Sequence, residues 1–156
     1  MSISPSAVMA DPDAPVASAL PAAAVAAATT IVAVVDDDPF VRAATGSLVR
    51  AFGWEAHTFC SAEDYLASGL AARTACLVCD IQMERLDGIG LLARLQKDGV
   101  APPTLFITAL TSETVRRRAL GQGALHVIDK PIDANELEEW VQRALASGPR
   151  GRASGG

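Results

Sequence analysis

Between residues 31 and 146 the sequence alternates five times between a short apolar run and a segment with helical features, and this alternation constrains the fold most strongly. Ile31–Val35 is a continuous run rich in β-branched residues, which is typical of a strand covered on both faces. The expected strands are residues 31–35, 54–59, 75–80, 104–108 and 125–128, and the expected helices are 39–51, 88–96, 112–120, one that starts at Ser61 and one capped by Asp133. Such alternation predicts a parallel sheet covered by helices on both faces, a doubly wound α/β fold.

Polar side chains stand where four of these strands end. The residues that end or follow the strands are Asp36 and Asp37, then Asp80, then Thr108 with Ala109, and finally Lys130 before Pro131. A doubly wound sheet binds its ligand outside the carboxyl ends of its strands, at the switch in strand order. Each residue alone is typical of a helix cap or a surface charge. Because all of them arrive at one edge of the sheet, the pattern indicates a functional site.

The chemistry of this residue set indicates phosphoryl transfer. Three nearby carboxylates repel one another and favour a hard divalent cation, and Mg²⁺ suits them because it uses few carboxylates and recruits phosphate oxygens. A carboxylate beside the cation can act as a nucleophile and form an aspartyl phosphate. The lysine and the hydroxyl group would match the negative charge of the phosphoryl group.

Four motifs resemble the receiver domain of two-component response regulators: VVDDDPFVR at 34–42, LVCDIQM at 77–83, FITAL at 106–110 and IDKPI at 128–132. The resemblance covers about residues 31–146 and implies a flavodoxin-like (βα)5 fold with a five-stranded sheet in the order 2-1-3-4-5. It implies Asp80 as the phosphoacceptor, with Asp36, Asp37, Asp80 and the backbone carbonyl of Gln82 as Mg²⁺ ligands. It also implies Thr108, Ala109 and Lys130 as switch and phosphate-binding residues, and a cis Lys130–Pro131 peptide bond.

Within the family, the sequence is most similar to receivers that head nitrogen-fixation regulators, and it departs from the family pattern near the site. Val127 stands where an aromatic residue often swings inward together with the switch threonine, so we expect a modest difference between the two conformational states. Gln82 and Leu110 occupy two variable positions that, in the family, influence how quickly water reaches the acyl phosphate. An apolar Leu110 is expected to restrict the attacking water.

The resemblance implies a phosphoacceptor that takes a phosphoryl group from a histidine kinase or a histidine phosphotransfer protein and signals to a downstream protein by contact. It implies no enzymatic activity beyond the chain's own phosphorylation and dephosphorylation. No recognition-helix pattern follows the last expected helix, so we expect no direct DNA binding. An identical site would serve a phosphate sink or kinase modulator. A flavin-binding electron carrier shares the fold, but DDDPF at residues 36–40 would repel a flavin phosphate.

Composition and charge indicate the setting of the protein. Eighteen acidic against thirteen basic side chains give a formal net charge of −5, which argues against a general nucleic-acid binder. Residues 1–30 are rich in Ala and Pro and predict a disordered leader, and residues 147–156 predict a flexible tail. No Lys or Arg precedes the uncharged stretch from Ser18 to Val35, and three aspartates follow it directly. We therefore expect no signal peptide and no membrane segment. Three cysteines are too few for a disulfide scaffold and fit a cytoplasmic setting.

The last two expected helices carry opposite charges. The first holds Arg116, Arg117 and Arg118, and the second holds Asp133, Glu136, Glu138 and Glu139. Both helices flank the expected edge strand at 125–128. We therefore expect this face to serve either a self-complementary homodimer or the docking of a partner protein.

Overall fold

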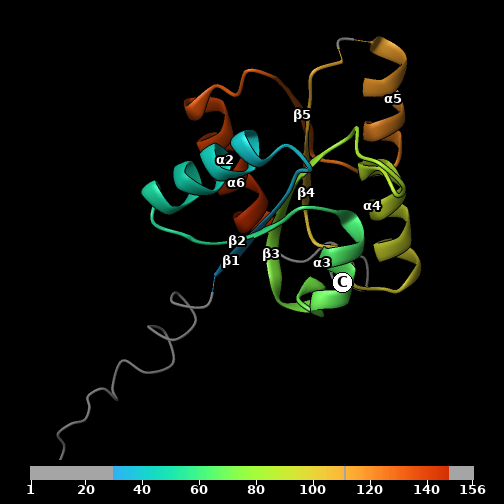
Figure 1. The fold of residues 1–156 in the computed structure, drawn as a ribbon, viewed down its shortest axis with the longest axis horizontal. Helices are drawn as coiled ribbons and strands as arrows, with labels where there is room; N and C mark the ends of the chain where they lie inside the picture. Colours follow the sequence, from blue (N-terminus) through green and yellow to red (C-terminus); the bar gives the residue numbers. More distant parts are fainter. Residues whose placement is uncertain (1–29, 111, 148–156) are drawn as a thin grey trace, which may run out of the picture. The chain divides into compact units, whose positions relative to one another are not determined.

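The computed structural model describes residues 30–110 and 112–147 (Figure 1). In chain order the elements are β1 (Ile31–Val35), α2 (Pro39–Ala51), β2 (Glu55–Phe59), α3 (Ala62–Ser68), the short 3-10 helix η2 (Ala71–Arg73), β3 (Thr74–Asp80), α4 (Gly88–Lys97), β4 (Thr104–Thr108), α5 (Glu113–Gly121), β5 (His126–Asp129) and α6 (Ala134–Ser147). The leader and tail expected from the sequence lie outside the described residues, apart from Thr30 and Ser147. Within the described ranges, none of the helices has both the length and the apolar character that crossing a membrane requires.

The five strands form one parallel sheet in the order β2-β1-β3-β4-β5. The predicted flavodoxin-like fold and its strand order are therefore confirmed. Val35 at the end of β1 is paired with Cys79 of β3, and Thr108 at the end of β4 is paired with Asp129 of β5. Because β1 and β3 are neighbours in register, the residues that come next, Asp36 and Asp80, emerge side by side.

The sheet divides the core into two layers, and helices cover each of its faces. Figure 1 shows α2 and α6 on one face and α3, α4 and α5 on the other. Side chains of β3 alternate between these layers: Cys76 lies with Val49 of α2, whereas Cys79 lies with Tyr65 of α3. The two cysteines of the C-x-x-C sequence thus point to opposite faces and do not form a thiol pair. Strands β1 and β4 are buried along their whole length, which explains their continuous apolar sequences.

Element boundaries agree with the sequence prediction to within one residue, and the differences have local causes. Trp54 was expected in β2, but its N–H donates to the Val49 carbonyl at 3.3 Å, so it belongs to the turn after α2. β5 extends to Asp129 because that residue pairs with Thr108. The η2 helix was not predicted because three residues carry no periodic signal. The expected N-caps accept hydrogen bonds from backbone N–H groups of the first helical turn at Asp38, Ser61 and Asp133.

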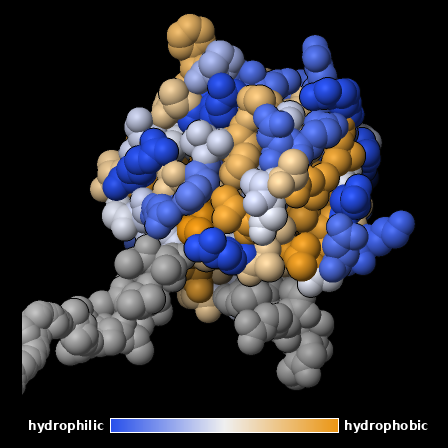
Figure 2. Space-filling model, turned by 60° about the horizontal axis from the view of Figure 1, so that its bottom comes forward, coloured by the Kyte–Doolittle hydropathy of each residue, from blue (hydrophilic) through white to orange (hydrophobic). Residues whose placement is uncertain are grey.

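Few large apolar side chains of the described residues are exposed. Those that are exposed are Phe40, at 84%, and Leu120, at 42%. Figure 2 turns the bottom of the molecule forward, and on this face apolar atoms gather between hydrophilic side chains. Phe40 is exceptional among the described residues, because it is a large aromatic residue whose side chain is mostly exposed to solvent.

Candidate functional site

Three carboxylates meet at the carboxyl edge of the sheet, where β1 and β3 end side by side. Asp36 and Asp80 are buried, with 2% and 5% of their surface exposed, and Asp37 is exposed. One carboxylate oxygen from each residue lies within 4.8 Å of the other two. Carboxylates at this separation repel one another and suit a hard divalent cation with oxygen ligands. The acid cluster, Asp36, Asp37 and Asp80, could therefore hold a metal ion.

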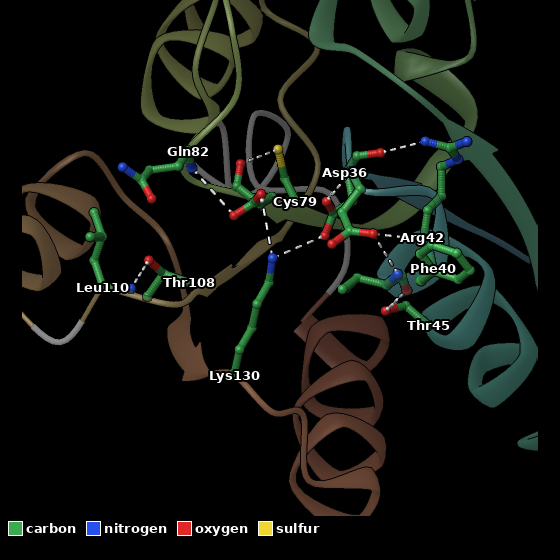
Figure 3. Close-up of polar contacts among 12 residues, drawn as sticks. Asp36, Phe40, Arg42, Thr45, Cys79, Gln82, Thr108, Leu110 and Lys130 are labelled. Carbon is green, nitrogen blue, oxygen red and sulfur yellow. Dashed lines mark hydrogen bonds and ion pairs between the residues drawn. The ribbon is translucent and has the colours of Figure 1, made fainter.

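Lys130 places an ammonium group between two of these carboxylates, as Figure 3 shows. Its Nζ atom lies 3.4 Å from Asp36 Oδ2 and 3.5 Å from Asp80 Oδ2, and the side chain is 19% exposed. The backbone N–H of Lys130 donates to the Thr108 carbonyl at 2.8 Å, and the Lys130–Pro131 bond is cis, as expected. The lysine therefore offsets part of the repulsion within the acid cluster and offers a cation to an incoming anion.

Burial and a neighbouring charge raise the pKa of the Asp80 carboxyl group to about 6. Burial is the largest cause, and the Asp36 carboxylate adds to it. The Lys130 ammonium group opposes the shift, as does the Gln82 N–H, which donates to Asp80 Oδ1 at 3.3 Å. At neutral pH the Asp80 carboxyl group is therefore ionised, and a bound cation would favour this form further.

Thr108 ends β4 beside the acid cluster and is 2% exposed. Its Oγ1 accepts a hydrogen bond from the Leu110 N–H at 2.9 Å, and Ala109 between them is exposed. In the adjacent strand, Asp80 is paired with Ile107, so Thr108 stands one residue beyond the level of Asp80. The hydroxyl group thus lies at the end of β4, directly before the loop that connects the site to α5.

A pocket of about 500 Å³ opens beside the acid cluster. Its lining includes Asp37, Gln82 and Leu110, together with Arg118 from α5. The two positions that the sequence singled out for control of water access therefore face the same pocket as the exposed acid of the cluster. Their influence on the lifetime of an acyl phosphate stays a prediction.

Elements α5, β5 and α6 form the face that was expected to bind a partner, and their side chains bond to one another. Val127 is buried in the layer shared with α3, α4 and α5. Arg116 of α5 donates to the Val127 carbonyl at 3.1 Å and to Asp129 Oδ1 at 3.0 Å. His126 Nε2 lies 2.8 Å from Glu136 Oε2 of α6. Two of the charges expected to face a partner are thus engaged within the chain, and the homodimer stays a prediction.

Three residues near the site were not singled out from the sequence. Arg42 donates to the Asp36 carbonyl, and Phe40 projects from the start of α2; both lie inside the VVDDDPFVR motif, which was the available signal. Gly88 opens α4 directly below the site, where a Cβ atom would collide with the Asp80 carbonyl oxygen. A residue with a side chain would therefore displace either α4 or the end of β3.

Comparison with known proteins adds independent evidence. The profile of the response regulator receiver domain matches residues 32–142. The chain belongs to this family. The transcriptional regulatory protein TdiR of Thauera aromatica is 30% identical over 113 residues, which are 72% of this chain and 50% of that protein. The C4-dicarboxylate transport transcriptional regulatory protein DctR of Rhodobacter capsulatus is 30% identical over 116 residues, 73% of this chain and 59% of that protein.

The crystal structure of FixJ-N superimposes on this receiver domain with a TM-score of 0.69 and 28% identity, covering 75% of this chain and 94% of that one. The family predicted from the four motifs is thus confirmed. This receiver domain spans about half the length of TdiR and somewhat more of DctR. The structure places the acid cluster, Thr108 and Lys130 together at one sheet edge, whereas Val127 lies buried within β5. The roles assigned to these residues stay predictions.

Proposed function

We propose that this receiver domain accepts a phosphoryl group on Asp80 from the phosphohistidine of a histidine kinase or a histidine phosphotransfer protein. The observation that carries the proposal is the Lys130 ammonium group between the Asp36 and Asp80 carboxylates. An Asp80 oxygen attacks phosphorus, the P–N bond breaks, and the imidazole nitrogen keeps the electron pair and takes up a proton. In dephosphorylation, a water oxygen attacks phosphorus and the Asp80 carboxylate leaves. The chain acts in this way only on itself and turns over no separate substrate.

Mg²⁺ is the proposed cation of the acid cluster. Asp36, Asp37, Asp80 and the backbone carbonyl of Gln82 would hold it, and the exposed Asp37 leaves room for the waters that Mg²⁺ retains. When bound, the ion supplies positive charge against the developing charge of the phosphoryl group. The Lys130 ammonium group then pairs with one phosphoryl oxygen, and the Thr108 hydroxyl group donates to another.

The donor docks over an apolar groove beside the site. This groove has a volume of about 290 Å³, and its lining includes Phe40, Ala44, Leu48 and Ile132 as well as Lys130. Phe40 is 84% exposed at the rim, and an apolar donor helix that carries the phosphohistidine would cover it. Phe40→Ala should slow transfer from the kinase, whereas phosphorylation by acetyl phosphate, which needs no docking, should keep its wild-type rate.

The output is proposed to pass to a downstream protein in the cytoplasm, through the face of α5, β5 and α6. Thr108 precedes the loop to α5, and Lys130 follows β5, so movement of either residue toward a phosphoryl group acts on this face. Arg116 joins α5 to β5 next to Lys130 and would transmit the movement between the two elements. Signalling by this chain is therefore proposed to proceed through protein contact.

Intact-mass measurement after treatment with acetyl phosphate tests the reaction. The wild-type chain should gain one phosphoryl group with Mg²⁺ and none with EDTA, because the acid cluster needs its charge neutralised. Asp80→Asn should gain none, while Asp98→Asn, which changes an exposed carboxylate paired with Arg94, should behave as wild type. Equal labelling of Asp80→Asn and wild type would overturn the assignment.

A second measurement separates a signalling receiver from a phosphate sink, since both use the same site. The phosphorylated chain is mixed with an unphosphorylated histidine phosphotransfer protein, and label on each protein is followed over time. Retention of label on Asp80 supports signalling by this chain. Rapid return of the label to histidine assigns the chain to a relay or sink.

A further inference from the structure

Arg42 joins helix α2 to the acidic end of β1. Its Nη1 atom donates to the Asp36 carbonyl oxygen at 2.8 Å, a contact that Figure 3 shows. Arg42 is the fourth residue of α2 and is half-buried. A guanidinium group is charged at all accessible pH values and donates in a fixed geometry. The contact therefore holds a backbone group of the site at a defined orientation relative to α2.

The carbonyl group that Arg42 holds belongs to the peptide that links Asp36 to Asp37. Other groups of Asp36 are held as well: its N–H donates to the Phe59 carbonyl at 3.1 Å, and its Oδ1 accepts from the Asp38 N–H at 2.9 Å. Asp37, in contrast, is exposed. The direction in which the Asp37 side chain leaves the backbone depends on the plane of the peptide that it shares with Asp36.

We propose that Arg42 is a positioning residue for the cation of the acid cluster. It sets the peptide plane between Asp36 and Asp37, and thereby the approach of the Asp37 carboxylate to the ion. The inference rests on the proposed binding of Mg²⁺ at this site. Groups that orient metal ligands typically change metal affinity roughly 10–100-fold when they are removed.

The positive charge of Arg42 acts on cation binding in the opposite direction. A fixed positive charge near three carboxylates disfavours a divalent cation, so removal of the charge alone would tighten Mg²⁺ binding. Loss of the hydrogen bond to the Asp36 carbonyl would weaken binding by releasing the peptide plane. The sign of the change in Kd therefore separates a positioning role from a purely electrostatic one.

Arg50 provides a matched control on the same helix. Its Nη2 atom donates to the Ala56 carbonyl at 3.1 Å, which is also a contact from an α2 guanidinium group to a backbone oxygen. Ala56 is paired with Val32 near the start of β1, away from the carboxyl edge of the sheet. Arg50→Met should therefore remove an equivalent guanidinium contact from α2 without disturbing the acid cluster.

Calorimetric titration of the full chain with Mg²⁺ tests the inference, alongside urea unfolding of each variant. Arg42→Met should raise the Kd for Mg²⁺ about tenfold, and Arg50→Met should leave it within about twofold of wild type. Arg42→Lys, which keeps a cationic donor, should recover part of the affinity.

An unchanged or lower Kd in Arg42→Met would overturn the positioning role, as would equal weakening in Arg50→Met. Should Arg42→Met fail to fold, Arg42→Gln carries the same test, since it removes the charge and the guanidinium fork but keeps a polar end. Absence of Mg²⁺ binding by the wild-type chain would instead overturn the proposed cation site itself. The two failures are thereby distinguished by the wild-type titration.

Discussion

Replacing Asp80 by Asn is expected to stabilise the fold when no divalent cation is bound. The pKa of the Asp80 carboxyl group is raised from 3.8 to about 6, mainly by burial and then by the Asp36 carboxylate. Each pKa unit corresponds to about 1.4 kcal/mol, so the native state disfavours ionised Asp80 by about 3 kcal/mol. Asparagine has nearly the shape of the protonated acid and carries no charge. At neutral pH the free energy of unfolding should therefore rise by up to about 3 kcal/mol, which is roughly 10 °C in Tm.

The stabilisation should depend on pH in a defined direction. Below about pH 4, Asp80 is protonated in both the folded and the unfolded chain, so variant and wild type should be alike at this position. Between about pH 4 and pH 6 the folded wild-type chain binds more protons at Asp80 than the unfolded chain does, and its stability falls as the pH rises. The variant has no such group, so the difference reaches its full size above about pH 6.

Urea unfolding in EDTA at about pH 4 and about pH 7.5 measures the difference. Asp98→Asn is the control, since the Asp98 side chain is 46% exposed and its loss should change stability by less than about 0.5 kcal/mol. Saturating Mg²⁺ should narrow the difference at neutral pH, because ligand binding stabilises the wild-type site. Equal stability of Asp80→Asn and wild type at neutral pH, or a difference that does not shrink in acid, would refute the electrostatic argument.

Three further outcomes are expected. In calorimetric titrations, Asp37→Ala should weaken Mg²⁺ binding more than Asp36→Ala, because the Asp36 carboxylate is already bonded within the protein while Asp37 is exposed; the reverse order would contradict this. An aromatic disulfide reagent should modify the exposed Cys60 in the native chain and leave the two buried cysteines of β3 unmodified until unfolding, because burial keeps the reagent from both of these thiols. Beryllofluoride, a phosphoryl mimic, should change hydrogen exchange as far as residues 112–140, and changes confined to the active-site loops would exclude the α5-β5-α6 face as the output surface.

The fold was predictable because each strand carries its own signal. Strands buried on both faces have continuous apolar sequences, and Thr104–Thr108 was predicted to the residue. The acid cluster was predictable for a topological reason, because parallel strands bring the residues at their carboxyl ends to one edge. Asp36 and Asp80 are far apart in sequence, yet their strands are neighbours in the sheet.

The side-chain contacts that support the site could not be predicted in the same way. Arg42 and Arg116 both donate to backbone carbonyl groups. Every residue has such a group, so the sequence does not indicate which one will accept the hydrogen bond. Long side chains also have many rotamers, so their partners depend on which elements pack together. The raised pKa of Asp80 likewise depends on burial that only the assembled layers create.

A buried acid at the end of an apolar strand destabilises the fold, and residues that do so are typical of functional sites. Asp80 is 5% exposed, and its raised pKa reports that the folded chain disfavours its charge. Lys130 offsets only part of this repulsion, since one ammonium group faces two buried carboxylates. A divalent cation would remove the rest, so the instability of the free chain and its affinity for the cation have the same electrostatic source. A neutral substitution in the acid cluster that stabilises the free chain should therefore weaken Mg²⁺ binding, and a variant in which both increase would contradict this coupling.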